Sequence, residues 1–154
     1  MKPPRYCTFG VNGLLLGIEI ERVQEVLRDQ EITPVPLAHD SVLGLLNLRG
    51  QIVPAIDARR CLGLAERSAG DPVVHVIVRC ADEAVSLAVD VADEVVDVGD
   101  DRCEHVPETL STSIRRLITG IYKLDAALLL VLDADLALSA GGLSGVVDGE
   151  RTGH

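Results

Sequence analysis

The sequence contains two copies of one pattern, each of which begins with glycine, turns near its middle and ends in an apolar run followed by Asp-Ala. The first copy spans residues 44–58 and the second residues 120–134, an offset of 76 residues. Similar segments precede them at residues 16–26 and 85–95, with an offset of 69. Because the order is kept, we infer two like halves with a groove between them. This layout suits the holding of partners, and the copies share no set of catalytic side chains.

The length and composition indicate a small β-rich chain. At 154 residues it is expected to form one domain, or two small subdomains that share an interface. Hydrophobic residues make up 47% of the sequence, but aromatic residues only 2%, so the core is expected to be aliphatic. The abundant Val and Ile residues favour strands.

The formal net charge of -10 excludes several classes of partner. Nucleic-acid binding requires a basic face, and an anionic membrane surface would repel this chain. Residues 82–104 hold nine acidic side chains and only one basic side chain, Arg102. This segment is either a solvated face that aids solubility or a docking face for a basic partner, and the sequence leaves both interpretations open.

The cysteines and the termini favour a cytoplasmic protein. The four cysteines are widely spaced and none belongs to a Cys-x-x-Cys pair: Cys7, Cys61, Cys80 and Cys103. The first residues contain no apolar stretch of the kind found in signal peptides. No apolar run reaches the roughly 20 residues that cross a bilayer, so direct membrane insertion is not expected. We therefore expect a soluble cytoplasmic protein with reduced thiols.

Short apolar runs separated by turns predict a series of hairpins. We expect strands at residues 5–11, 14–20, 43–48, 51–57, 73–79, 84–89, 118–124 and 127–132. The Asn12-Gly13 and Arg49-Gly50 turns separate two of these pairs, and Asn-Gly is a strong hairpin signal. With eight to ten short strands, the pattern predicts all-β barrels or sandwiches. Alternating α/β architecture is disfavoured, because no amphipathic helices of 10–15 residues separate the strands.

Other segments are expected to form short helices or irregular structure. Residues 22–27, 59–62 and 133–139 are expected to be short helices, the last capped by Asp133. Residues 91–98 are ambiguous between helix and strand. Polar segments at 66–72 and 100–113 are expected to be connections, and the Gly- and Ser-rich tail from residue 141 to 154 is expected to be disordered.

The sequence offers no recognisable catalytic or metal-binding constellation. Cys103 and His105 are the only close thiol–imidazole pair, whereas a structural zinc site usually needs two such pairs. No serine lies in a Gly-x-Ser-x-Gly context, and no phosphate-binding glycine loop is present. Asp57 and Asp133 occupy equivalent places in the two repeats, which the capping of a turn explains. We therefore expect no enzyme activity, no metal and no cofactor; a deep pocket lined by Cys103, His105 and carboxylates would revive the enzyme hypothesis.

The turn at Asn47-Leu48-Arg49-Gly50 holds an arginine between two apolar strands. Two interpretations remain open at this point. The guanidinium of Arg49 either points to water or forks onto a nearby carboxylate, for which Glu25 is the natural candidate.

Several segments together resemble the CheW family of chemotaxis coupling proteins. The resemblance covers roughly residues 5 to 138 in order, and its most specific part is the Asn-Leu-Arg-Gly turn followed by Ile-Val-Pro. The segments that carry it are residues 16–26, 32–36, 44–57, 89–90, 110–112, 119–120 and 132–133. The second turn, Leu124-Asp125-Ala126, departs from the pattern because it lacks the Arg-Gly pair.

This resemblance implies a mainly β fold made of two SH3-like five-stranded β-barrel subdomains packed together, with a few short helices. It implies one CheW-like domain over residues 1–140, with subdomains at roughly 14–72 and 73–132. Strand 5–11 and helix 133–139 would complete the shared core.

The resemblance also implies a non-catalytic adaptor that links chemoreceptor cytoplasmic tips to the regulatory domain of a CheA-type histidine kinase, at receptor arrays on the inner membrane face. The receptor surface would be formed or supported by Val23, Glu25, Asn47, Arg49 and Gly50. Exposed barrel ends would meet the kinase, but no kinase-binding residue is assigned. The same coupling role in a system that controls pili or surface sensing is the alternative.

Overall fold

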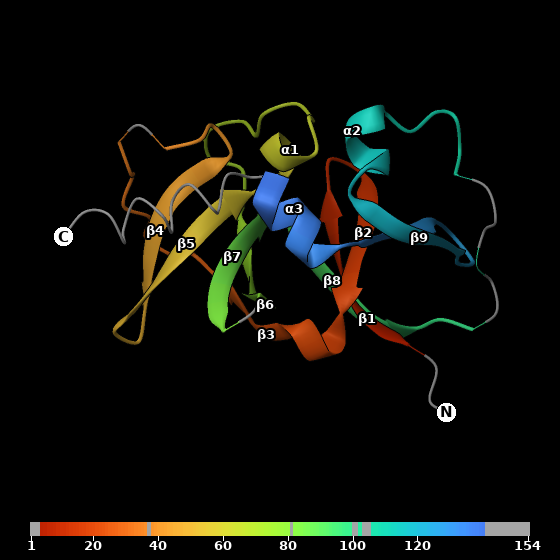
Figure 1. Cartoon of the computed structure of the whole chain (residues 1–154), viewed down its shortest axis with the longest axis horizontal. Helices are drawn as coiled ribbons and strands as arrows, with labels where there is room; N and C mark the ends of the chain where they lie inside the picture. Colours follow the sequence, from red (N-terminus) through yellow and green to blue (C-terminus); the bar gives the residue numbers. More distant parts are fainter. Residues whose placement is uncertain (1–3, 37, 81, 100–101, 103–105, 141–154) are drawn as a thin grey trace.

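The chain forms two five-stranded β-sheets with a few short helices beside them (Figure 1). The computed structural model describes residues 4–36, 38–80, 82–99, 102 and 106–140. One sheet, here called the first barrel, has the strand order β3 (Val23–Arg28), β6 (Val74–Cys80), β7 (Glu83–Val89), β5 (Gln51–Asp57), β4 (Val42–Leu48). The other, the second barrel, has the order β8 (Val91–Asp97), β1 (Arg5–Val11), β2 (Leu14–Glu19), β10 (Leu128–Leu132), β9 (Ile118–Lys123). The predicted mainly β fold with two five-stranded units is confirmed.

The sequence analysis expected one subdomain before residue 72 and the other after it. The strand orders differ from this expectation, because each sheet contains strands from both sides of residue 72. Strand β2 lies in the second barrel beside β10, and strands β6 and β7 lie in the first barrel, where β7 pairs with β5. The repeat itself is real, because β1–β5 and β6–β10 occupy equivalent places in the two strand orders. Each repeat, however, gives its first two strands to one sheet and its last three to the other. Sequence similarity identifies equivalent strands, but long-range pairing decides which strands share a sheet.

The residues predicted as a helix at 22–27 form a strand instead. A 3₁₀ turn, η1 (Ile20–Arg22), leads directly into β3, and alternate residues of β3 are exposed. The apolar spacing of this segment fits a helix and an edge strand almost equally, and pairing of Glu25 with Ile77 and Leu27 with His75 decides for the strand. The ambiguous segment 91–98 is likewise a strand, β8, paired with β1.

The remaining helices are short and capped by side chains. Asp57 caps α1 (Ala58–Cys61) by accepting a hydrogen bond from the backbone N–H of Arg59. Asp133 caps α3 (Ala134–Ala140), with 3.1 Å between its Oδ1 and the backbone nitrogen of Leu136. The polar connection at 100–113 leads into a further helix, α2 (Thr112–Arg115), which Ser111 caps and which was not predicted. The tail expected to be disordered, residues 141–154, lies outside the described residues.

Three hydrophobic clusters fill the fold, one between the barrels and one inside each barrel. The shared cluster is the largest and joins both sheets through residues such as Phe9, Leu16, Ile56, Val76 and Leu87. The first barrel encloses Leu46, Leu48, Val53, Ala55, Ile77 and Ala84. The second encloses Tyr6, Val98, Leu129 and Val131. Successive residues of a strand therefore enter different clusters, since their side chains point to opposite faces of the sheet.

A cluster of ions fixes the crossing between the two barrels. Asp90, which follows β7, accepts hydrogen bonds from Arg59 at 2.7 Å, Arg67 at 3.0 Å and the backbone N–H of Asn12 at 2.7 Å. Arg67 also lies 3.4 Å from Asp57. Because these groups come from the β1–β2 turn, the end of β5 and the β7–β8 junction, the cluster joins segments of both repeats. Burial alone would raise the pKa of Asp90, but these hydrogen bonds outweigh it and lower the pKa to about 2.

The structure also shows the state of the cysteines and the lengths of the helices. Cys7, Cys61 and Cys80 carry free thiols, and Cys103 lies outside the described residues. None of the described helices is long and apolar enough to cross a bilayer.

We expect the Asp90 cluster to make the free energy of unfolding decrease at acidic pH. Above about pH 4 the carboxylate is ionised in both states, so its ion pairs contribute fully. As the pH falls from about 4 towards 2, the unfolded chain takes up the proton first and stability decreases. Asp90→Asn should lower the free energy of unfolding at pH 7 by roughly 1–3 kcal/mol and flatten this acid dependence. Urea unfolding at pH 7, 4 and 3 measures both effects; an unchanged slope in the variant would contradict the assignment.

The connection after β3 lies against β4 at Gly44. Thr33 and Leu45 form a two-way backbone bridge there, with N–O distances of 2.8 Å. Gly44 has φ +146, and a Cβ there would lie 2.2 Å from the carbonyl oxygen of Thr33. We expect Gly44→Ala to destabilise the fold by about 2–4 kcal/mol. Gly99, around which a Cβ meets nothing within 4 Å, supplies the control. Gly99→Ala should stay within about 0.5 kcal/mol of the parent in the same denaturant titration.

Candidate protein-docking site on the first barrel

The turn between β4 and β5 is held in a rigid geometry. Arg49 has φ +52 and Gly50 has φ +87, the pair of positive angles that a type I′ hairpin turn requires. The side-chain oxygen of Asn47 accepts a hydrogen bond of 2.8 Å from the backbone N–H of Gly50. Asn47 and Gly50 therefore support the backbone that presents Arg49.

The guanidinium of Arg49 forks onto the carboxylate of Glu25. Its nitrogens donate to Oε1 of Glu25 at 2.8 and 3.0 Å and to Oε2 at 2.5 Å. Of the two interpretations left open by the sequence, ion pairing is therefore the one observed. Glu25 approaches from β3, rather than from the helix expected there. Since β3 and β4 are the two outermost strands of the first barrel's sheet, this ion pair bridges the seam of the barrel.

The solvent exposure of the Arg49–Glu25 pair limits its contribution to folding stability. The Arg49 side chain is 67% exposed and the Glu25 side chain 24%. Such a pair contributes at most about 1 kcal/mol to folding in solvent. One face of the guanidinium remains available to a partner, while Glu25 fixes its position. The arrangement is thus a preoriented cation on a surface corner.

Val23 differs from the other four candidate residues. It lies at the start of β3, pairs with Val78 and packs partly buried against the cluster shared by the barrels. The fold therefore brings Glu25, Asn47, Arg49 and Gly50 together at one corner and places Val23 two residues further along the strand.

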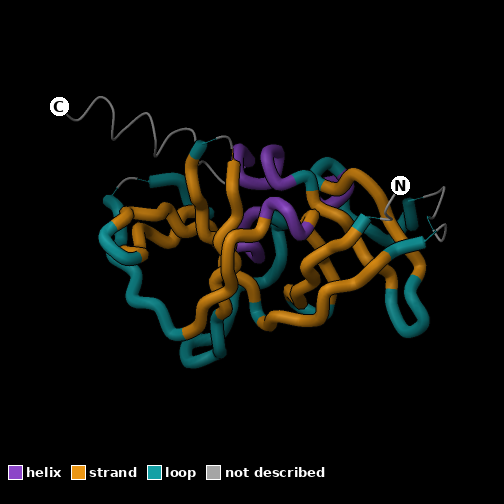
Figure 2. The backbone as a smooth tube through the Cα atoms, turned by 90° about the horizontal axis from the view of Figure 1, so that it is seen from below, coloured by secondary structure: helices purple, strands orange, loops and turns teal. Residues whose placement is uncertain are grey.

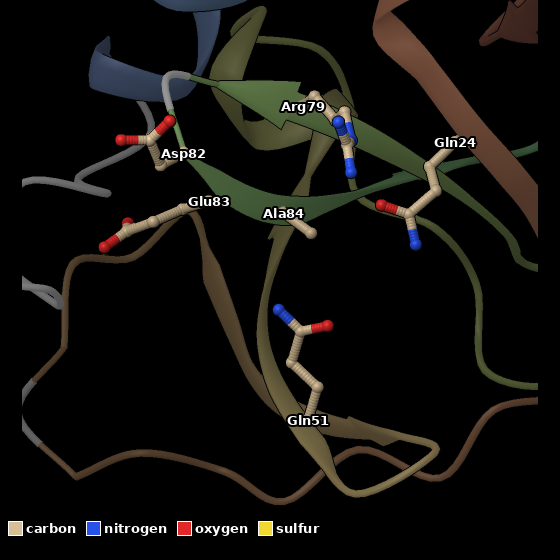
Figure 3. Close-up of a pocket in the computed structure, with 6 residues that line it drawn as sticks. All are labelled: Gln24, Gln51, Arg79, Asp82, Glu83 and Ala84. Atoms are coloured by element: carbon tan, nitrogen blue, oxygen red, sulfur yellow. The ribbon is translucent and has the colours of Figure 1, made fainter.

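An open cleft of about 320 Å³ adjoins this corner and was not predicted (Figure 3). Its lining residues come from β3, from the start of β5 and from both sides of the β6–β7 turn: Gln24, Gln51, Arg79, Asp82, Glu83 and Ala84. Gln24 precedes Glu25, and Gln51 follows Gly50, so the cleft continues directly from the Arg49 turn. The alternation of inward- and outward-facing residues along β5 and β6 could have placed Gln51 and Arg79 at the ends of barrel strands. Only the sheet order shows that these strands belong to the same barrel.

The described residues hold no set of three or more side chains that could bind a metal ion. The Cys103–His105 pair lies outside them. His75 is buried and bonded to Ser86 at 2.9 Å, and burial together with the charge of Arg67 lowers the pKa of His75. Burial raises the pKa of Cys61 to about 12, which leaves its thiol protonated and unreactive at neutral pH. These groups fill the core and do not converge on a shared cleft.

The geometry is that of a two-barrel scaffold with a polar surface corner, and comparisons with known proteins give its family. A model of the CheW-like domain matches residues 5–141. The chemotaxis protein CheW of Bacillus subtilis is 32% identical over 130 residues, which cover 84% of this chain and 83% of that protein. The chemotaxis protein CheW of Klebsiella aerogenes is 28% identical over 138 residues, covering 90% and 82%.

A solved structure agrees with these matches. The scaffolding protein TtCheW from Thermoanaerobacter tengcongensis has a TM-score of 0.79 and 26% identity, over 91% of this chain and 95% of that chain. The chain therefore belongs to the family of CheW-like domain proteins. The expectation of two SH3-like barrels is confirmed with it.

A double-mutant cycle on Arg49 and Glu25 would measure the seam pair. We expect Arg49→Ala and Glu25→Ala each to lower the free energy of unfolding by about 0.5–1 kcal/mol. Because each truncation removes the same interaction, the double variant should lose less than the sum of the two. Denaturant unfolding of the four proteins gives the coupling energy, and a coupling indistinguishable from zero would mean that the pair contributes nothing to closure of the barrel.

Proposed function

We propose that this chain is a non-catalytic adaptor that couples chemoreceptors to a CheA-type histidine kinase in bacterial chemotaxis. The match of the CheW-like domain over residues 5–141 is the observation that carries the proposal. The two like barrels offer separate surfaces for different partners, as an adaptor requires.

The receptor's cytoplasmic tip is proposed to dock at the corner of the first barrel. Arg49 and Glu25 would provide the charged contact, Asn47 and Gly50 would hold the turn, and Val23 would support β3 from the core side. A guanidinium fixed by a carboxylate loses little rotamer freedom on docking, which favours binding. The proposal assigns binding to the corner and not to Arg49 alone.

The regulatory domain of the kinase is proposed to bind at exposed barrel ends other than the one that carries Arg49, and we assign it no residues. This division lets receptor and kinase be held at the same time. We further propose a cytoplasmic location, at receptor arrays beside the inner membrane. That location follows from the proposed partners.

Charge reversal at Arg49 tests the proposal. We expect Arg49→Glu to remain folded, because an exposed ion pair contributes little to stability, yet to reduce receptor-dependent kinase activation tenfold or more by placing two acids together. Binding to the isolated regulatory domain of the kinase should stay within about twofold of the parent chain. Titration calorimetry and a reconstituted kinase assay measure the two quantities.

Arg116→Glu supplies the matched control, since Arg116 is exposed at the end of α2 and is not among the residues of the proposed receptor surface. Full coupling by Arg49→Glu would remove the receptor site from this corner. Failure of the folded parent chain to bind the kinase domain at high micromolar concentration would remove the proposed function itself.

A further inference from the structure

The cleft in Figure 3 is the mouth of the first barrel. Along β5 the inward-facing residues Val53 and Ala55 are buried, and the same alternation continues outward to Gln51. Along β6 the inward-facing Ile77 is followed by Arg79, which pairs across the sheet with Ala84. The rows that fill the barrel with apolar side chains thus end in polar ones. Barrel mouths are preferred places for binding sites.

The fold does not require polar side chains at the positions of Arg79 and Gln51, because the described residues at the equivalent positions of the second barrel are small or apolar. At the repeat offset, Gly10 and Leu15 occupy the positions of Arg79 and Ala84, and they pair in the same register. Ala127 occupies the position of Gln51, as the backbone bond from Leu124 to Ala127 shows. The same architecture is therefore completed there with small and apolar residues.

Arg79 differs from most arginines of the described chain in having no carboxylate partner. Ion pairs engage Arg5, Arg22, Arg49, Arg59, Arg60 and Arg67. No ion pair within the described residues joins the guanidinium of Arg79 to an acid, although the chain has a net charge of -10. Its backbone oxygen, in contrast, is used by Arg22 at 2.8 Å. A cation at the rim of a cleft that pairs with none of the described acids is available to an acid supplied by another molecule.

The walls of the cleft restrict what can enter. Figure 3 shows Arg79 and Gln24 on one side, Asp82 and Glu83 on the other, and Gln51 facing the space between. The guanidinium and the carboxamide groups can donate hydrogen bonds to a carboxylate. The two acids opposite would repel a second negative charge. The cleft therefore suits one isolated acidic side chain better than an acidic run.

We propose that the mouth of the first barrel receives an acidic side chain of the receptor tip, with Arg79 as the recognising cation and Gln24 and Gln51 as hydrogen-bond donors. This inference rests on the proposed function and extends its docking surface from the Arg49 turn into the adjoining cleft. The receptor tip is chosen as the partner because Gln24 and Gln51 are direct neighbours of Glu25 and Gly50, which are assigned to the same surface. Docking would cover Arg79 and exclude water, which strengthens its pairing with the incoming carboxylate.

Binding titrations with the complete chain test this inference. The receptor tip and the regulatory domain of the kinase are each titrated against the parent chain, Arg79→Gln, Arg79→Glu and Arg28→Glu. Arg28 lies at the far end of β3 and is exposed, so it is the control from the same barrel. We expect Arg79→Gln to weaken tip binding about tenfold and Arg79→Glu to weaken it further, while Arg28→Glu and all kinase titrations stay within about twofold.

A charge exchange identifies the partner group. The acidic residues of the tip are replaced by Arg one at a time to find the one that contacts Arg79. The tip variant at that residue should bind the Arg79→Glu chain and bind the parent chain poorly. Tip binding by both Arg79 variants within twofold of the parent overturns the inference and leaves the proposed function standing. Loss of kinase binding in place of tip binding overturns the assigned partner. Absence of tip binding by the folded parent chain overturns the proposed function together with this inference.

Discussion

The pairing of strands from different repeats is the constraint on which the rest of the structure depends. Strand β2 runs parallel to β10, and β5 runs parallel to β7, so neither sheet can be completed by one repeat. Each crossing between the barrels is closed by an ion pair. Asp90 and Arg59 close one, and Arg22 and Asp135 close the other at 2.7 Å. Arg59 and Asp135 occupy equivalent positions at the repeat offset of 76, so this position carries a cation in one repeat and an acid in the other. The barrels are therefore two surfaces of one cooperative unit.

This exchange of strands determines how the docking corner is supported. Glu25 enters the first barrel only because the chain crosses over after β2, and Arg49 reaches it from the opposite edge of the same sheet. In the second barrel, Asp125 and Glu94 stand at the positions equivalent to Arg49 and Glu25, and two acids cannot form such a bridge. Inside that barrel, Tyr6 packs with Val98, Leu129 and Val131, and its ring lies 5.9 Å from the ring of Tyr122. The repeats thus share a backbone plan while only one of them carries the preoriented cation.

Much of this architecture follows from local patterns in the sequence, and the rest depends on distant contacts. The hairpin at Arg49-Gly50 was predictable because a tight turn between apolar strands leaves few conformations. The sequence left open whether Arg49 points to water or pairs with Glu25, and the structure shows the pair. The helix predicted at residues 22–27 was wrong. The apolar spacing of this segment fits a helix and a strand, and its pairing with β6 makes it a strand. The division of strands between the barrels was also wrong, because a repeat does not reveal exchange. The cleft at Arg79 was missed for a related reason: its side chains come from four strands, β3, β5, β6 and β7, that meet only in the folded sheet.

The asymmetry between the barrels gives a physical basis for separating stability from recognition. Residues that serve the fold have counterparts in both repeats, as Asp57 and Asp133 do at their helix caps and Val53 and Leu129 do inside the barrels. Arg49 and Arg79 have counterparts of different chemistry, Asp125 and Gly10, and the second barrel folds without them. Both arginines lie at the same end of the first barrel, and this asymmetry is why partner recognition is proposed for that end.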